Sequence, residues 1–164
     1  MAVLSDGDIL AAMQRGDLLI EPFRDDALTP NGVDLRVAEV LLPDRGPEPV
    51  RSGVVEVPAH ARFLVSTAER VRLGPQLAGQ LWIRSSYARK GFLAAFGKVE
   101  AGFDGTLTIG AFNASAQPVP LPIGERFCQL AFEPLSSPAA KVYAQRSGTY
   151  QGQRGVTLAR ESQP

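Results

Sequence analysis

Apolar residues near the start of the chain recur with helical spacing. Ile9, Leu10 and Met13 form an apolar stripe over about one turn. Ser5 precedes the stripe and has an acidic residue three positions later, which is typical of a capped helix start, and Gly16 is a typical stop. We therefore predict a short helix near the N-terminus.

After Gly16 the apolar residues alternate with polar ones. Val33, Leu35 and Val37 follow this pattern, as does Leu107 with Ile109, and strict alternation is typical of a strand with one buried face. Proline cannot donate to a sheet ladder, so runs that contain it are predicted to be edges or turns. These prolines are Pro58, Pro118, Pro120 and Pro122. The pattern predicts a mainly β fold, a distorted β-barrel or jelly-roll with one or two short helices.

The chain shows no internal repeat and no linker, and residues 1–146 are predicted to form a single β domain. The tail over residues 147–164, SGTYQGQRGVTLARESQP, is polar and rich in glycine. It has too little apolar surface to fold alone. We expect a flexible tail that a partner surface or a ligand would order.

Charge and hydropathy exclude several classes of function. The 164 residues include 17 Lys and Arg against 17 Asp and Glu, so the net charge is zero. This balance gives no electrostatic footprint for nucleic acid or for an anionic membrane. No stretch approaches the roughly 18 apolar residues of a membrane span, and the first residues do not resemble a secretion signal. We expect a cytoplasmic protein.

The single cysteine, Cys128, and the single histidine, His60, limit the chemistry further. They exclude an intramolecular disulfide, an ordinary zinc site and the signature of zinc-dependent deaminases. A Ser-His-Asp triad would have to use His60, which lies in a predicted turn. Cys128 is expected to face the interior as a small apolar group.

The segment WIRSSYARKG carries the strongest chemical pattern. It is predicted to be a strand ending at a turn that gathers Arg84, Ser85, Ser86 and Arg89. Guanidinium groups bind phosphate oxygens in pairs, and hydroxyls and turn amides complete such a shell. The segment therefore fits a polyphosphate. The alternative is a polar strand end with solvated arginines, which the short pattern alone favours.

Acidic residues mark two other segments. In GKVEAGFDGTLTIGAFN, Glu100 and Asp104 flank Phe103 at a predicted hairpin bend. A carboxylate there could activate water and the aromatic ring could stack on a sugar, although solvated turn residues are the ordinary alternative. Asp34 follows a turn in PNGVDLRV, and Gln129 lies on a predicted strand in GERFCQLAF.

Taken in order, these segments resemble the dCTP deaminase and dUTPase superfamily, and in particular its dCTP deaminase branch. PNGVDLRV, RSSYARKG, EAGFDGTLTI and GERFCQL are similar to its first four motifs, and YQGQRGVTLAR to its C-terminal lid. The resemblance implies a homotrimer of distorted β-barrels with active sites at the subunit interfaces. Its deaminases use no zinc, because a glutamate activates water. In its dUTPases a third-motif carboxylate aligns water on the α-phosphate.

The resemblance also implies roles for individual residues. Glu100 would be the catalytic base, with Ser85 and Arg89 as its catalytic partners. Asp34 would hold, through waters, a magnesium ion that rides on the triphosphate of dUTP or dCTP. Phe103 would stack on the deoxyribose. The other implied nucleotide contacts are Arg84, Ser86, Gln129, Tyr143, Tyr150 and Gln153.

This chain departs from the family pattern at four places. Gly110 stands where the deaminases carry their catalytic glutamate. The usual third-motif aspartate is replaced by Glu100, whose carboxylate reaches roughly an ångström further, and misplacement on that scale can cost about 100-fold in rate. The base-recognition hairpin between Gly91 and Glu100 is about two residues shorter than in relatives. Thr149 replaces a lysine found in many of them.

Three hypotheses follow. The first is a hydrolase that converts dUTP or a related deoxynucleoside triphosphate to the monophosphate and pyrophosphate. The second is a dCTP deaminase in which Glu100 or another acid replaces the missing glutamate. The third is a relative that binds nucleotide without turnover.

Overall fold

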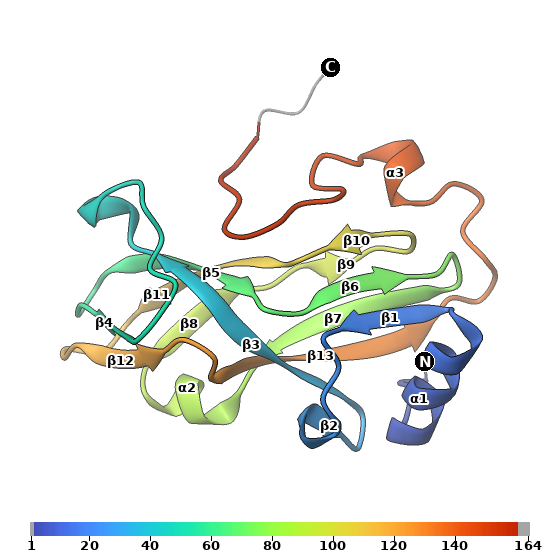
Figure 1. Ribbon diagram of the computed structural model, residues 1–164, viewed down its shortest axis with the longest axis horizontal. Helices are drawn as coiled ribbons and strands as arrows, with labels where there is room; N and C mark the ends of the chain where they lie inside the picture. The colour runs from blue at the N-terminus through green and yellow to red at the C-terminus, as the bar shows by residue number, and fades with distance from the viewer. Residues whose placement is uncertain (1, 161–164) are drawn as a thin grey trace.

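The computed structural model describes residues 2–160 and confirms the mainly β class (Figure 1). Alternating residues form most of its strands because one face of each packs inward. The strands are β1 (Leu18–Glu21), β2 (Leu28–Thr29), β3 (Gly32–Leu41), β4 (Val54–Val57), β5 (Arg62–Thr67), β6 (Arg70–Leu73), β7 (Leu77–Ile83), β8 (Phe92–Ala95), β9 (Lys98–Val99), β10 (Asp104–Gly105), β11 (Thr108–Asn113), β12 (Val119–Pro122) and β13 (Arg126–Pro134).

The strands form one large curled sheet and two small ones. The large sheet has eight strands in the order β8-β11-β5-β3-β13-β7-β9, with β2 added beside β3. The small sheets are β1-β6-β10 and β12-β4. Strand β12 pairs only with β4, so the prediction that the proline-rich run lies at an edge is confirmed.

The predicted N-terminal helix is α1 (Asp6–Arg15), and local signals define both of its ends. The Ser5 hydroxyl accepts a hydrogen bond from the Asp8 amide at 3.3 Å. Gly16 closes the helix in the left-handed conformation, with φ of 78°. Two further α-helices are α2 (Ser85–Arg89) and α3 (Tyr143–Arg146), and two short 3₁₀ turns are η1 (Asp25–Ala27) and η2 (Pro43–Arg45). The described residues thus hold three α-helices, where one or two helices were predicted. None of the helices in this part of the chain has the length and apolar character needed to cross a membrane.

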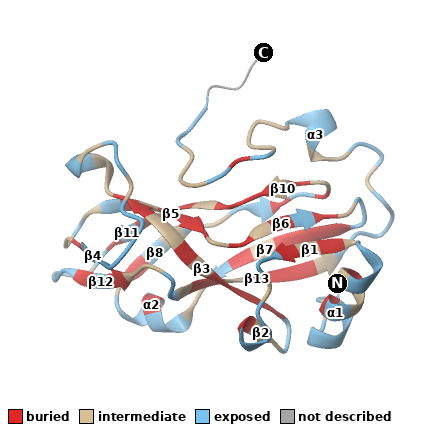
Figure 2. Ribbon diagram, viewed as in Figure 1, coloured by how far each residue is buried: buried red, intermediate tan, exposed pale blue. Residues whose placement is uncertain are grey.

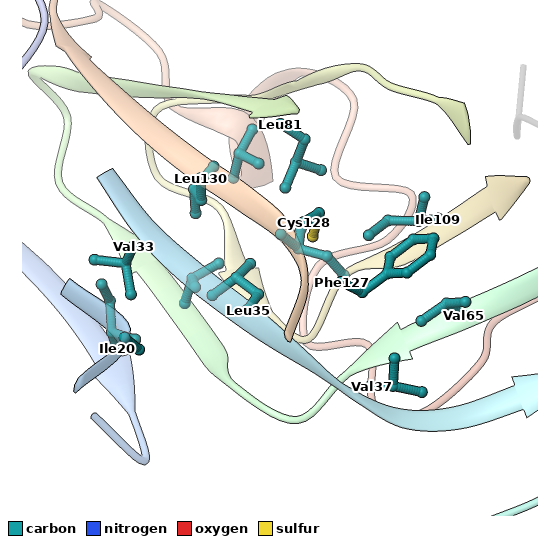
Figure 3. Close-up of a cluster of buried hydrophobic side chains, with 14 of the residues drawn as sticks. Ile20, Val33, Leu35, Val37, Val65, Leu81, Ile109, Phe127, Cys128 and Leu130 are labelled. Atoms are coloured by element: carbon teal, nitrogen blue, oxygen red, sulfur yellow. The ribbon is translucent and has the colours of Figure 1, made fainter. Parts of the chain in front are cut away.

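The core lies inside the curled sheet, where side chains from β3, β5, β11 and β13 meet (Figures 2 and 3). Val33, Leu35 and Val37 are all at most 1% exposed, as their alternation predicts. Cys128 is fully buried there, and burial raises the pKa of its thiol. The expectation of an inert interior cysteine is confirmed.

The predicted turn after β7 is instead the short helix α2. The strand ends at Ile83, and Arg84 occupies the position just before the first residue of the helix. A single helical turn forms here because it carries Tyr87 into the core, where its ring stacks on Phe92 with centroids 5.7 Å apart. The residues around Tyr87 on α2 remain exposed.

Residues 147–160, called the C-terminal segment below, lie along the barrel (Figure 1). Gln153 pairs with Thr106: the Thr106 amide donates to the Gln153 carbonyl at 3.1 Å, and Gln153 Nε2 donates to the Thr106 carbonyl at 2.7 Å. From the sequence we expected a partner surface or a ligand to order this segment. In the structure, hydrogen bonds to the chain's own sheet hold it in place. The predicted domain boundary after residue 146 stays a prediction, and residues 161–164 lie outside the described part.

Candidate functional site

A hollow of about 320 Å³ lies beside the start of α2 and is called the α2 hollow below. It brings together most of the predicted phosphate-binding residues, because β7 ends where β3 and β13 run beside it. Its lining residues are Thr29, Asp34, Trp82, Ile83, Arg84, Ser85, Ser86 and Gln129. The predicted contact Arg89 lies on the same helix, one turn further on.

The floor of the α2 hollow is a buried charge. Asp34 is 4% exposed, and its Oδ2 lies 3.2 Å from Arg84 Nε and 3.8 Å from Arg126 Nη1. Burial raises the pKa of Asp34 more than these two guanidinium groups lower it. The single carboxylate of Asp34 only partly balances the positive charges of the two arginines, so the hollow would attract an anion.

Trp82 was not predicted as a site residue, yet it forms a wall of this hollow. In the sheet register Gln129 lies opposite Asp34 on β3 and opposite Trp82 on β7, so the three side chains form one row across the sheet. Trp82 is 58% exposed. Its signal in the sequence was the alternation of β7, where Leu81 points inward and Trp82 outward.

A second hollow, of about 350 Å³, gathers the remaining predicted residues and is called the Glu100 hollow. Glu100 is exposed at its rim, in the turn that follows β9. The buried Phe103 packs edge-on against Tyr143, with centroids 5.6 Å apart. The lining residues are Lys98, Val99, Glu100, Phe103, Leu107, Tyr143, Ser147, Thr149, Tyr150 and Gln153.

The two acids flanking Phe103 have different surroundings. Asp104 is bound by both nitrogens of the Arg70 fork, at 2.6 and 2.7 Å, and this pairing lowers the pKa of Asp104. Glu100 forms no ion pair with any residue in the described range 2–160. Of the two, Glu100 is therefore the carboxylate available to act on a bound water.

One chain does not bring the two hollows together. They share no lining residue, and in Figure 1 α2 lies at the lower edge of the molecule, whereas β9 and β10 lie above β7 and α3 lies higher still. Ser85 and Glu100 thus line separate hollows on one chain.

Gly110 lies on the outward face of β11, opposite Leu64 on one neighbouring strand and Ala95 on the other. A Cβ atom placed on Gly110 would meet only Leu64 Cδ2, at 3.7 Å. The strand has room for a side chain here, so glycine is not required by packing. The face is a shallow apolar hollow of about 700 Å³, lined by Arg62, Leu64, Leu93, Ala94, Ala95, Gly110, Ala111 and Phe112.

Comparison with known proteins identifies the family. The model of the family described as dCTP deaminase-like matches residues 3–135. The chain belongs to the dCTP deaminase-like family. It is 43% identical to a dCTP deaminase of Thermococcus gammatolerans over 145 residues, which cover 88% of this chain and 90% of that protein. It is also 37% identical to a probable deoxyuridine 5'-triphosphate nucleotidohydrolase of Sulfolobus islandicus rod-shaped virus 1, over 97% of this chain and 99% of that one.

Solved structures of similar fold confirm the curled half-barrel of this dCTP deaminase-like chain. The dCTP deaminase of Agrobacterium tumefaciens superposes with a TM-score of 0.66 at 21% identity, covering 79% of this chain. The chain spans 47% of the length of that protein. A native EIAV dUTPase superposes with a TM-score of 0.54 at 19% identity, over 79% of this chain and 98% of that one. At these identities the likeness establishes the fold.

A magnesium ion of the kind that the family resemblance implies would meet a single carboxylate, that of Asp34, in the α2 hollow of this dCTP deaminase-like chain. Across residues 2–160 no three His, Cys, Asp or Glu side chains form a group that could hold a metal ion. Magnesium commonly keeps several waters and uses one or two carboxylates together with substrate phosphates. Asp34, a single carboxylate on the floor of the α2 hollow, fits that arrangement.

Proposed function

We propose that this chain hydrolyses dUTP to dUMP and pyrophosphate. The observation that carries the proposal is the pair of substitutions at the two acid positions. Gly110 removes the deaminase glutamate from a strand with room for it, while Glu100 keeps an exposed third-motif carboxylate that has no ion pair with residues 2–160. The viral relative named as a probable deoxyuridine triphosphate nucleotidohydrolase supports the same reading.

The proposed step is attack of water on the α-phosphorus. Glu100 accepts a proton from the water, the new bond forms between the water oxygen and phosphorus, and the bond to the bridging oxygen breaks to release pyrophosphate. Arg84 and Arg89 hold the phosphate oxygens and stabilise the developing charge, with the hydroxyls of Ser85 and Ser86. A magnesium ion on the triphosphate would neutralise phosphate charge, and Asp34 would bind it through waters. We also propose that the protein is located in the cytoplasm.

The site in this proposal is shared between copies of the chain in a homotrimer. Because Glu100 and Ser85 line separate hollows on one chain, we infer that a second copy places them at one nucleotide. The outward face that holds Gly110 supports such contact, since Leu93 is 61% exposed and Phe112 is 39% exposed.

Mixing inactive variants tests the shared site. Glu100→Gln and Ser85→Ala should each be inactive alone, whereas trimers reassembled from both should regain part of the activity, because some interfaces then carry two intact halves. Absence of any regained activity in confirmed mixed trimers would place the whole site on one chain.

The second candidate is dCTP deamination, which the name of the 43% identical relative favours. It requires Glu100 or another acid to move protons between water and the cytosine ring in place of the missing glutamate. General acid–base catalysis by a positioned group contributes about 10²–10⁴-fold.

Product analysis separates the candidates. The purified protein and magnesium are incubated with dUTP or with dCTP, and the products are resolved by ion-exchange chromatography. We expect dUMP and pyrophosphate from dUTP, lost in Glu100→Gln and retained in Glu48→Gln, an exposed loop control. Deaminated product from dCTP would favour the second candidate. Nucleotide binding without any product would identify a non-catalytic relative.

A further inference from the structure

A β-bulge in β3 turns Glu39 toward the C-terminal segment. In the pairing of β3 with β5, Val37 lies opposite Thr67 but Glu39 lies opposite Ser66, so one extra residue stands between them. A bulge of this kind redirects the side chains that follow it. The Glu39 side chain is 17% exposed, which is low for a glutamate on an outer face.

The Glu39 carboxylate contacts two segments that are distant in sequence. Its Oε2 accepts a hydrogen bond from the Val156 amide at 3.1 Å, and its Oε1 accepts one from Arg51 Nε at 3.2 Å. Val156 belongs to the C-terminal segment, whereas Arg51 belongs to the exposed loop before β4. One carboxylate thereby joins both segments to the barrel.

Gly155 shows how closely the segment approaches Glu39. Its φ of +65° suits glycine, and a Cβ atom there would lie 2.9 and 3.0 Å from the two Glu39 oxygens. Thr108 supports the same stretch, since its hydroxyl accepts from the Thr157 amide at 3.0 Å and donates to the Gly155 carbonyl at 3.3 Å.

We propose that Glu39 is a positioning residue for the nucleotide site. By holding the backbone of Val156 it keeps the C-terminal segment docked, and so keeps Tyr150 and Gln153 at the Glu100 hollow. The segment is mostly polar, so hydrogen bonds to the barrel contribute much of what holds it, and the bond from Val156 to Glu39 has a charged acceptor. The docking role follows from these contacts and does not depend on catalysis, whereas its effect on turnover rests on the proposed hydrolysis of dUTP.

Hydrogen exchange measures the docking without any need for catalysis. We expect Glu39→Ala to speed exchange of the amides of residues 153–157 by about 10-fold or more. Glu39→Gln should restore most of the protection, because its amide oxygen can still accept from Val156. Gly155→Ala should resemble Glu39→Ala, since it pushes the segment from the carboxylate. Arg51→Ala should have a smaller effect, because Val156 keeps its acceptor.

The matched control is Glu56→Ala, which removes an exposed glutamate from β4. Exchange in β13 should stay unchanged in every variant. Unchanged exchange over residues 153–157 in both Glu39→Ala and Gly155→Ala would overturn the docking role.

Kinetics with dUTP test the second half of the proposal. If only docked molecules bind nucleotide productively, KM scales inversely with the docked fraction. A Glu39→Ala chain that is docked about one tenth of the time should therefore have a KM raised about 10-fold and a kcat within about 2-fold of the native value, with Glu39→Gln close to the native chain. Loss of nearly all exchange protection over residues 153–157 together with an unchanged KM would overturn the role in the site. If the native chain does not hydrolyse dUTP, the proposed function fails, and hydrogen exchange still decides whether Glu39 docks the segment.

Discussion

The guanidinium of Arg84 lies 3.2 Å from the buried carboxylate of Asp34, and this contact joins the second motif to the first. Arg84 stands at the end of β7 and Asp34 near the start of β3, two strands that flank β13. The ion pair holds the arginine at the mouth of the α2 hollow before a ligand arrives. The side chain of Arg84 is therefore already ordered, and phosphate binding does not carry the entropy cost of ordering it.

Arg84→Lys tests the use of this preorganised fork. Lysine keeps the charge but cannot present two parallel N–H groups, so we expect about 10-fold weaker binding of dUTP. Isothermal titration calorimetry measures the change. Arg45→Lys, on the exposed turn η2, is the control and should bind like the native chain. Equal affinity in both variants would mean that the guanidinium of Arg84 makes no paired contact with phosphate oxygens.

Gly110→Glu tests whether the missing glutamate alone prevents deamination. Because only Leu64 lies within 4 Å of a new Cβ, we expect the variant to fold and to deaminate dCTP about 100-fold faster than the native chain or more. Gly110→Gln has the same size and cannot exchange protons, so it is the matched control. If both variants show the native rate, the deaminase geometry has been lost beyond this one residue.

The Arg70–Asp104 pair should make stability depend on pH in a defined direction. Arg70 lowers the pKa of Asp104, so the pair contributes stability above the ordinary aspartate pKa of about 4 and loses it as the pH falls through the lowered value. Asp104→Asn should therefore be less stable by about 0.5–1 kcal/mol at pH 7, with the difference closing at acidic pH. Urea unfolding at several pH values measures it.

Asp44→Asn is the control for that experiment, since Asp44 is exposed on η2. It should follow the native chain at every pH. A deficit in Asp104→Asn that stays constant from neutral to acidic pH would show that the lost interaction is not electrostatic.

Trp82 should report nucleotide binding directly. It is the single tryptophan and is 58% exposed on the wall of the α2 hollow, so we expect dUTP to change its fluorescence with a saturable dose dependence. Trp82→Phe should remove the signal while calorimetry still detects binding. Saturable binding by calorimetry with no change in fluorescence would place the ligand away from this hollow.

Local signals in the sequence were sufficient for α1 and for the alternating strands. Ser5 and Gly16 define the ends of α1 through contacts within a few residues, and β3 follows its apolar pattern. The helix α2 could not be predicted in that way, because five residues contain too little periodicity. It forms because Tyr87 packs on Phe92, a contact that appears only once the curled sheet has formed.

The residue types of the candidate site could also be predicted, because four segments resemble the family's motifs and follow one another in the family's order. Their surroundings could not. Glu100 and Asp104 look equivalent in the sequence, and only the pairing of Asp104 with Arg70, 34 positions away, distinguishes them. The role of Glu39 depends on a bulge and on a segment more than a hundred residues later, so no local pattern indicates it.

The stacking of Tyr87 on Phe92 has a consequence for how a ligand is captured. Phe92 also packs against Phe63, with centroids 4.7 Å apart, so α2 is tied to the interior of the barrel. The helix cannot shift without disturbing that aromatic cluster, whereas the C-terminal segment is held by hydrogen bonds at the surface. We therefore expect the phosphate-binding end of the proposed site to stay fixed, and we expect the C-terminal segment, residues 147–160, to set how fast a nucleotide is enclosed or released.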